Sequence, residues 1–223
     1  MLSIVSTPIG NLGDITLRAI ETFKKCDAVV CEDTRVTGNL LHHLEIPKKE
    51  FISLHGYSDA GKLEMVIRKL KEGQHLCLTS DAGTPGISDP GYALVSRARQ
   101  EGIPIEVIPG PAAFLAALSA SGLPIHQFVY LGFLPLKKGR KTLLASFATE
   151  ERTIVFYESV HRIERTLDEL ADALATQPER NVVIARELTK MHEEIVSTTV
   201  LDLKGTAKTL TKKGEFVMVI GAL

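Results

Sequence analysis

Short apolar runs alternate with amphipathic stretches along the first half of the chain. The runs have the length and composition of buried strands, and the stretches between them carry apolar residues at the spacing of one helix face. The expected strands cover residues 2–7, 28–31, 51–54, 75–79 and 105–108. The expected helices cover residues 15–25, 35–44, 60–71, 92–101 and 112–120. This alternation predicts a mostly parallel sheet with helices on both faces.

The pattern changes near residues 122–124, where Gly122 and Pro124 interrupt it. Beyond them the expected strands cover residues 128–131, 153–157, 181–185, 194–201 and 215–220. The expected helices cover a basic stretch, residues 137–147, and residues 163–174. The looser connections of the last two strands suit a mixed sheet. The sequence therefore predicts two α/β domains, residues 1–121 and residues 122–223.

Composition narrows the class of protein. The 223 residues are 44% hydrophobic and 24% charged with a net charge of −1, which is typical of a soluble globular protein. A global basic field is absent, so contact with nucleic acid requires local patches. No apolar run approaches the roughly 18 residues of a membrane span, and the first residues indicate a strand rather than a signal peptide. We expect no membrane association.

Cysteine and histidine usage points to a cytoplasmic protein without a metal. The three cysteines show no CxxC spacing, which favours a reducing compartment. The seven histidines form no metal-ligand spacing. Dinucleotide, phosphate-loop, zinc-protease and serine-hydrolase signatures are also missing.

Four loops at expected strand ends carry the polar chemistry. They are residues 7–14, 32–35, 80–91 and 109–113. Because strand ends of one polarity share an edge of a parallel sheet, we expect the loops to converge on one crevice. For Asp14 and Asp89 we favour helix caps, whereas Asp81 suits a ligand with hydroxyls or positive charge. A plain Pro/Gly-rich turn is the alternative for residues 80–91.

Nine segments in this order resemble the 16S rRNA cytidine 2′-O-methyltransferases of the tetrapyrrole methylase superfamily. They are residues 7–15 (TPIGNLGDI), 31–35 (CEDTR), 80–85 (SDAGTP), 87–91 (ISDPG), 109–111 (PGP), 132–135 (GFLP), 156–159 (FYES), 186–190 (RELTK) and 213–216 (KGEF). The resemblance runs from Ser3 to Ile220. One departure is Val160, where the family usually has proline, and members often carry a further C-terminal domain beyond the point matching Leu223.

The resemblance implies an S-adenosylmethionine-dependent enzyme. The methyl group would go to the ribose 2′-hydroxyl of a cytidine in the decoding region of 16S rRNA, within the small ribosomal subunit. The enzyme would be a cytoplasmic homodimer with the cofactor in a cleft between two α/β domains. The residues that this resemblance assigns to the cofactor are Pro8, Gly10, Asp81, Gly83, Thr84, Ala112, Ala113, Phe156, Tyr157, Ala185 and Arg186.

Removal of the hydroxyl proton calls for a general base or hydrogen-bond acceptor. The candidates are Glu32, Asp33, Glu158 and His161, of which we favour Asp33 and Glu158. An ion pair with Arg35 is the alternative role for Asp33. A pairing with His161 or Arg162 is the alternative for Glu158.

RNA contact is assigned to the densest basic cluster. Its members are Lys137, Lys138, Arg140 and Lys141, and Arg35 is expected to add to the same surface. Phosphate binding by such a cluster would depend on salt. The alternative is a solvated helix start.

Two other functions remain open on the sequence alone. A tetrapyrrole methyltransferase would need a large apolar cleft, and the basic cluster argues against it. A non-catalytic module that senses a nucleotide-like ligand is the other. Labelled methyl transfer to small subunits, but not to porphyrinoids, separates the three.

Overall fold

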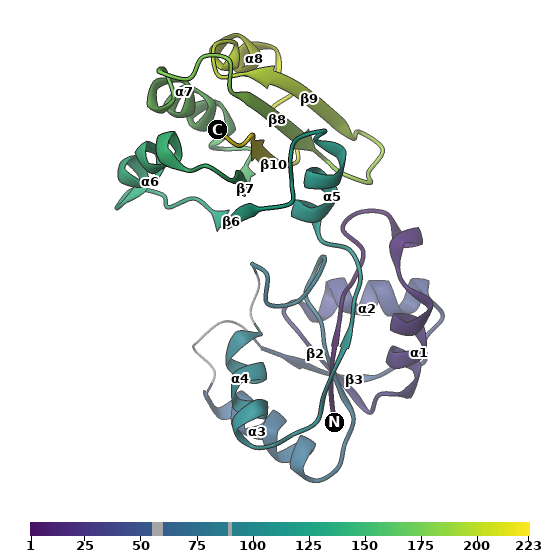
Figure 1. The fold of residues 1–223 in the computed structure, drawn as a ribbon. Helices are drawn as coiled ribbons and strands as arrows, with labels where there is room; N and C mark the ends of the chain where they lie inside the picture. The colour runs from purple at the N-terminus through teal and green to yellow at the C-terminus, as the bar shows by residue number, and fades with distance from the viewer. Residues whose placement is uncertain (55–59, 89–90) are drawn as a thin grey trace. The chain divides into compact units, whose positions relative to one another are not determined.

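The computed structural model describes residues 1–54, 60–88 and 91–223. It divides into two compact units, Met1–Ala112 and Ala113–Leu223, which are described separately (Figure 1). Asp89 lies outside the described residues, so its predicted role as a helix cap has no structural counterpart here.

The first unit is built on a parallel five-stranded sheet in the order β3-β2-β4-β1-β5. Its strands are β1 (Leu2–Val5), β2 (Ala28–Cys31), β3 (Glu50–Ser53), β4 (Leu76–Leu78) and β5 (Ile105–Ile108). Leu2 of β1 lies opposite Leu76 on one side and Ile105 on the other. The predicted parallel sheet is confirmed.

Helices cover both faces of this sheet, as Figure 1 shows. They are α1 (Leu17–Lys25), α2 (Thr34–His43), α3 (Ala60–Lys71) and α4 (Tyr92–Gln100). Phe23 of α1 and Leu41 of α2 share a core with Val29. The next residue along β2, Val30, points to the opposite face and packs in a core with Leu94 of α4. Both faces of the central strands are therefore buried.

The start of α1 differs from the prediction. Thr16 is its N-cap, with the Thr16 hydroxyl accepting a hydrogen bond from the Ala19 amide at 3.1 Å. Asp14 ends a short 3₁₀ turn, η1 (Leu12–Asp14), that Asn11 caps. The expected cap at Asp14 is wrong because this extra turn separates the loop from the helix.

The second unit contains a mixed sheet in the order β6-β7-β10-β8-β9. Only the β6–β7 pair is parallel, and the other pairs are antiparallel. The strands are β6 (Phe128–Phe133), β7 (Thr153–Ser159), β8 (Asn181–Arg186), β9 (Glu194–Thr199) and β10 (Glu215–Ile220). The predicted mixed sheet is confirmed.

Four helices and one short turn complete this unit. They are α5 (Ala113–Ala120), α6 (Arg140–Ser146), η2 (Phe147–Thr149), α7 (Ile163–Ala173) and α8 (Leu203–Thr209). Leu144, Leu167 and Leu203, from α6, α7 and α8, enter the same core on one face of the sheet. Helix α8 was not expected, since its seven residues include Gly205 and two threonines, which are weak helix formers.

The chain enters the second unit earlier than the expected boundary after residue 121. Helix α5 packs against β7 and β10, and its Phe114, Ala117 and Leu118 are buried. The division between the two units therefore falls between Ala112 and Ala113. The break in the apolar pattern near Gly122 marks the end of α5 and not the division between the two units.

Candidate functional site

Three loops of the first unit meet at the carboxyl edge of its sheet. The backbone groups of Thr7 and Gly83 pair in both directions, with N–O distances of 2.9 and 3.1 Å. The Thr84 hydroxyl lies 3.0 Å from the Ser6 hydroxyl and donates to the Pro111 carbonyl at 3.0 Å. The loops after β1, β4 and β5 thus form one bonded cluster.

Glycine is required at two points of this cluster. Gly83 has a φ of +80°, a conformation that side-chain-bearing residues rarely adopt. A Cβ added to Gly110 would lie 2.8 Å from Ser6 Cβ. Two backbones therefore approach as closely as glycine permits.

The topology makes this edge a suitable place for a ligand. β1 and β4 are neighbours, while α1 and α4, which follow them in the chain, cover opposite faces of the sheet. Such a switch point leaves a crevice outside the carboxyl ends of the strands, where open α/β sheets bind their ligands.

Asp81 is the one predicted cofactor residue of this edge with an ionisable side chain. Its Oδ1 accepts a hydrogen bond from the Asp33 amide at 3.1 Å. Within the described part of the chain no partner is recorded for its Oδ2. The side chain is half-buried, so this oxygen suits a ligand hydroxyl or a positive charge.

The other predicted residues of the first unit differ in accessibility. Pro8 and Ala112 are buried, while Gly10 is exposed. Thr84 is half-buried with its hydroxyl engaged, and Gly83 contributes backbone only. Contacts to a ligand would thus come mainly from backbone groups.

Asp33 forms local interactions that fit the alternative considered for it. It is the N-cap of α2, where its Oδ1 accepts from the Arg35 amide at 2.8 Å. Its Oδ2 pairs with Arg35 Nη2 at 2.6 Å. Hydrogen bonds from the Arg35 side chain and amide hold the pKa of Asp33 well below its usual range. A carboxylate so stabilised is a weak base.

Four predicted cofactor residues lie on β7 and β8 of the second unit. Phe156 and Ala185 are buried in the interior, so only their backbone groups could approach a ligand. Arg186 is also buried, and its Nε donates to Glu194 at 2.9 Å. Tyr157 is half-buried, and its hydroxyl oxygen accepts a hydrogen bond from the Phe114 amide at 3.3 Å. Tyr157 is therefore the best placed of the four to offer a side chain. Ala113, half-buried, begins α5.

Glu158 lies in a buried ionic cluster, and this position does not fit a catalytic base. The residue is 1% exposed. Its Oε1 forms an ion pair with Arg162 Nε at 2.8 Å, and its Oε2 accepts a hydrogen bond from the Thr166 hydroxyl at 2.7 Å. Arg140 Nη2 lies 3.6 Å from Oε2. The pairing with Arg162 that we considered as an alternative is present, and Arg140 joins it.

Arg140 is likewise misassigned as an RNA contact. Its guanidinium is buried and donates to Glu169 at 2.6 Å, to Thr166 at 2.6 Å and to the Pro135 carbonyl at 3.2 Å. A side chain with these partners cannot reach a phosphate. The correction arises because Arg140, the first residue of α6, directs its side chain toward Thr166 and Glu169 of α7 rather than toward solvent.

The three lysines around Arg140 are accessible to solvent. Lys137, Lys138 and Lys141 are exposed, and none of them forms an ion pair within residues 1–54, 60–88 and 91–223. Arg35 is 87% exposed at its side chain but is paired with Asp33. RNA binding by these residues stays a prediction.

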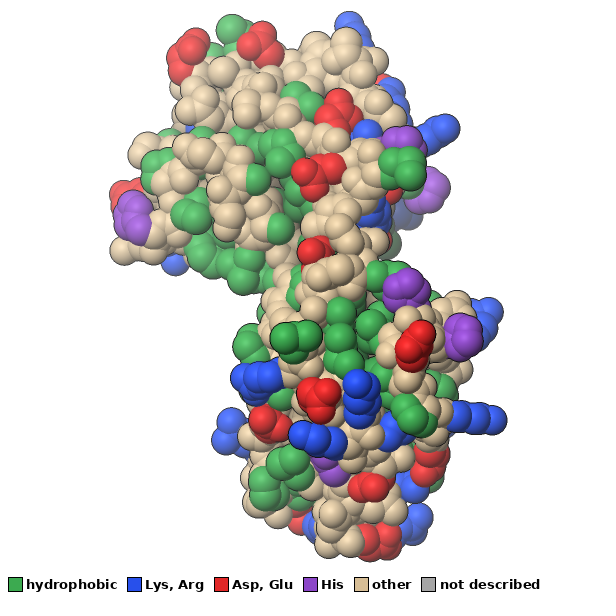
Figure 2. Space-filling model, turned by 90° about the vertical axis from the view of Figure 1, so that its right-hand side faces the viewer, with side chains coloured by type: hydrophobic (Ala, Val, Ile, Leu, Met, Phe, Trp, Pro, Cys, Tyr) green, Lys and Arg blue, Asp and Glu red, His purple; other side chains and the backbone are tan. Residues whose placement is uncertain are grey.

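Outside the lysines near the start of α6, positive and negative side chains lie side by side on the surface. On the face that Figure 2 shows, lysine and arginine lie beside aspartate and glutamate, with no extended basic area. Among the described residues, no group of three or more histidine, cysteine, aspartate or glutamate side chains could hold a metal ion. In the same residues no helix has the length and apolar character needed to cross a bilayer.

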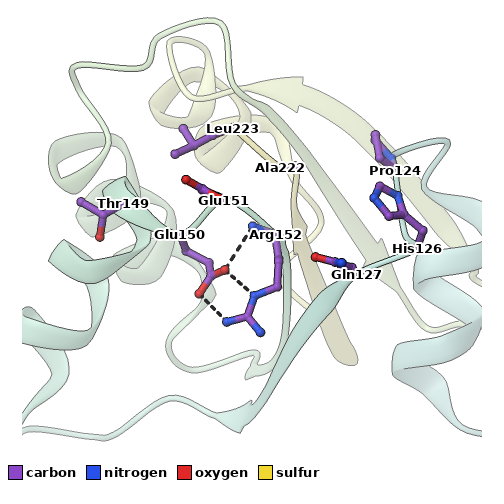
Figure 3. Close-up of a pocket in the computed structure, with 9 residues that line it drawn as sticks. All are labelled: Pro124, His126, Gln127, Thr149, Glu150, Glu151, Arg152, Ala222 and Leu223. Atoms are coloured by element: carbon purple, nitrogen blue, oxygen red, sulfur yellow. Dashed lines mark hydrogen bonds and ion pairs between the residues drawn. The ribbon is translucent and has the colours of Figure 1, made fainter.

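A depression of about 900 Å³ lies at another place, next to the last residues of the second unit (Figure 3). Glu150 and Arg152 face each other there, with Nε and Oε1 2.7 Å apart. Hydrogen bonds from Arg152 lower the pKa of Glu150 to about 2. These charges satisfy each other, and no predicted site residue lines the depression.

Comparison with known proteins identifies the family. A model of the tetrapyrrole (corrin/porphyrin) methylases matches residues 1–204. The chain belongs to this family. It is therefore an enzyme of a methyltransferase family, as the sequence predicted.

Two similar curated proteins are both named ribosomal RNA small subunit methyltransferase I. The one from Pasteurella multocida (strain Pm70) is 48% identical over 99% of this chain and 78% of its own length. The one from Hydrogenobaculum sp. (strain Y04AAS1) is 41% identical over 98% of this chain and 94% of its own length. Both matches extend through the two units.

Solved structures of other proteins share the fold. Diphthine synthase superposes with a TM-score of 0.74 at 17% identity, covering 99% of this chain and 89% of its own. Uroporphyrin-III C-methyl transferase from Thermus thermophilus, complexed with S-adenosyl homocysteine, gives 0.66 at 20% identity, covering 99% and 96%. At these identities the likeness establishes the two-unit α/β architecture of this tetrapyrrole methylase.

Sequence reasoning did not anticipate the contacts that hold the loops together. Ser6 and Pro111 bond to Thr84, and Gly110 allows the close approach. A small polar residue directly after the first strand was the available signal at Ser6. Nothing local in the sequence indicated that Arg140 would pair with Glu169, 29 residues away.

Proposed function

We propose that this methylase transfers a methyl group from S-adenosylmethionine to the ribose 2′-hydroxyl of a cytidine in 16S rRNA of the small ribosomal subunit. The observation that carries the proposal is the 41–48% identity to relatives named ribosomal RNA small subunit methyltransferase I, over 98–99% of the chain. The choice of cytidine and of the 2′-hydroxyl rests on the motif resemblance.

The carboxyl edge of the first sheet fits the cofactor. S-adenosylmethionine offers ribose hydroxyls and a cationic sulfonium, and Asp81 Oδ2 is an acceptor without a recorded partner among the described residues. The close backbone packing at Gly83 and Gly110 gives a rigid wall, which limits the entropy lost on binding. That Tyr157 of the second unit contacts the same cofactor stays a prediction.

When bound, the cofactor supplies an electrophilic methyl group. The task of the protein is to align the acceptor hydroxyl with it and to accept the hydroxyl proton. Since Asp33 and Glu158 are held in ion pairs, we propose Glu32 or His161 for the proton. His161 is exposed at the turn after β7, where a solvent-borne substrate could reach it.

The binding of RNA is proposed for the exposed lysines near the start of α6. Lys137, Lys138 and Lys141 lie within five residues of chain, and each is exposed without an ion-pair partner in the described structure. We also propose that the protein is a homodimer and works in the cytoplasm. Sedimentation of the purified chain would test the dimer.

The deciding experiment is incubation of the protein with methyl-labelled S-adenosylmethionine and small ribosomal subunits from a strain lacking the modification. We expect label on the ribose of one cytidine of 16S rRNA. An Asp81→Ala variant should lose cofactor affinity by tenfold or more, while Asp172→Ala, on an exposed ion pair, should not.

Label on porphyrinoids instead would favour a tetrapyrrole substrate. Cofactor binding without label on either substrate would favour a ligand-sensing module. Either result would contradict the proposed substrate while leaving the family unchanged.

A further inference from the structure

Five aromatic rings are in contact in the second unit. Phe114 of α5 lies between Phe128 and Tyr130, with ring centroids 6.2 and 4.5 Å away. Tyr130 contacts Tyr157 edge-on at 5.6 Å, and Phe133 contacts Tyr157 at 5.5 Å. We call this set the aromatic cluster. It joins α5, β6 and β7 on one face of the sheet.

Phe133 ends the aromatic cluster and is its most exposed ring. It is 54% exposed, against 37% for Phe128 at the opposite end. The β6–β7 register shifts between Tyr130 and Phe133, where Gly132 has a φ of +61°. After this shift Phe133 pairs with Tyr157, so its ring leans on Tyr157 with one side and is open to solvent on another.

The backbone next to Phe133 is firmly held. Arg162 Nη1 donates to the Leu134 carbonyl at 2.9 Å, and Arg140 Nη1 donates to the Pro135 carbonyl at 3.2 Å. Both arginines are anchored by the buried carboxylate of Glu158. An exposed ring on such a segment loses little freedom when it binds a partner.

Positive charge follows Phe133 directly in the chain. Lys137, Lys138 and Lys141 are exposed, and among the residues that the structure describes they have no acidic partner. A partner with both flat rings and negative charge would therefore complement this segment. An unpaired strand of nucleic acid has both, since each base presents a π-face and each link a phosphate.

We propose that Phe133 is a stacking platform for an unpaired base of the RNA substrate, with the phosphates beside that base contacting Lys137 and Lys138. The inference rests on the proposed function and narrows its substrate to RNA that presents at least one base out of a helix. A duplex would not fit, because its bases are stacked on one another and are not available to Phe133.

The test compares Phe133→Leu with Phe133→Trp in methyl transfer to small subunits. Leucine keeps an apolar side chain but has no π-face, whereas tryptophan keeps one. We expect the leucine variant to raise the KM for the subunits about tenfold with the KM for S-adenosylmethionine unchanged. The tryptophan variant should restore the wild-type value, and Phe128→Leu is the matched control in the same cluster.

A second measurement does not depend on catalysis. A single-stranded RNA oligonucleotide carrying 2-aminopurine, whose fluorescence is quenched by stacking, is titrated with each variant. We expect quenching by the wild type and the tryptophan variant, and at least threefold less by the leucine variant.

Wild-type behaviour of Phe133→Leu in both measurements would overturn the proposal. If the wild type labels no subunit but shows quenching that depends on Phe133, stacking stands and the proposed substrate fails. If labelling succeeds and quenching and KM are independent of Phe133, the proposed function stands and the stacking role fails.

Discussion

The two units assemble their polar groups in opposite ways. At the carboxyl edge of the first sheet, hydroxyls and backbone groups of Ser6, Thr84 and Pro111 bond to one another, and Asp81 adds a half-buried carboxylate. At the end of β7 in the second unit, Arg140 and Glu158 are buried as ions. The first arrangement leaves an acceptor oxygen for a ligand, whereas the second uses its charges internally.

This difference shows that a charged residue in a motif can have either of two roles, to stabilise the fold or to bind a ligand. Buried ions are costly unless each is paired and hydrogen-bonded, so a charge inside a fold is committed to its partners. Glu158 forms an ion pair with Arg162 and accepts hydrogen bonds from the Thr166 hydroxyl and the Ser159 amide. The carboxylates that can act on a ligand are those whose oxygens keep an open side, as in Asp81.

The sharpest way to break the comparison is to remove the central carboxylate of the second unit. Glu158→Ala leaves Arg140 buried without one of its two counter-charges, and we expect a loss of about 3–5 kcal/mol in unfolding free energy. Urea denaturation measures it. Asp172→Ala removes an exposed pair with Lys204 and should cost about 1 kcal/mol or less. Equal effects of the two substitutions would show that burial of the cluster does not matter.

The corresponding test of the first unit adds one methyl group. In Gly110→Ala the new Cβ meets Ser6 Cβ at 2.8 Å, a contact that neither backbone can relieve by a rotamer change. We expect about 1–3 kcal/mol of destabilisation and a fall of tenfold or more in S-adenosylmethionine affinity. Calorimetric titration gives the affinity. Gly61→Ala, in α3 with nothing within 4 Å, is the control and should be neutral or stabilising.

Much of the fold could be predicted because apolar periodicity reports burial. The bounds of α3, β5 and β10 agree with the expected residues 60–71, 105–108 and 215–220. In β2 and β4 every residue is buried, and such strands appear as unbroken apolar runs. Convergence of the loops followed from parallel topology alone.

The misassigned residues depended on contacts between distant parts of the chain. A run containing Lys137, Lys138 and Arg140 predicts a basic surface, but the run itself does not indicate whether one of these side chains is buried. Arg140 turns inward because Thr166 and Glu169 of α7 lie at its guanidinium. No local pattern encodes that meeting. For Glu158, the local pairing with Arg162 was an alternative open to the sequence, but its contacts with Arg140 of α6 and Thr166 of α7 were not indicated.

A smaller effect is expected from the exposed lysines, which, unlike the buried Arg140, can contact phosphate. In Lys137→Ala/Lys138→Ala the slope of log affinity for small subunits against log salt concentration should fall by about 1–2, because each phosphate contact contributes roughly 0.7–0.9. Filter binding from 50 to 200 mM salt measures it. Thermal stability should stay unchanged, since both side chains are exposed. An unchanged slope would place the RNA contact elsewhere.

The smallest expected effect concerns Asp33. Asparagine at this position keeps the N-cap of α2. If the role of Asp33 is to pair with Arg35, Asp33→Asn should change the methyl-transfer rate at pH 7 by less than about twofold. A loss of a hundredfold, the scale of general base catalysis, would restore Asp33 as the base. Glu32→Gln, assayed beside it, tests the neighbouring candidate.

The pH dependence of stability checks the same assignment independently of activity. The ion pair lowers the folded-state pKa of Asp33 below the unfolded value of about 3.9, so its stabilisation is complete above that pH and is lost as the pH falls further. The wild type should therefore melt above Asp33→Asn at pH 6, and the gap should narrow toward pH 2. A gap that is constant with pH would mean that the Arg35 pair does not form in solution, and Asp33 would then be available to accept a proton.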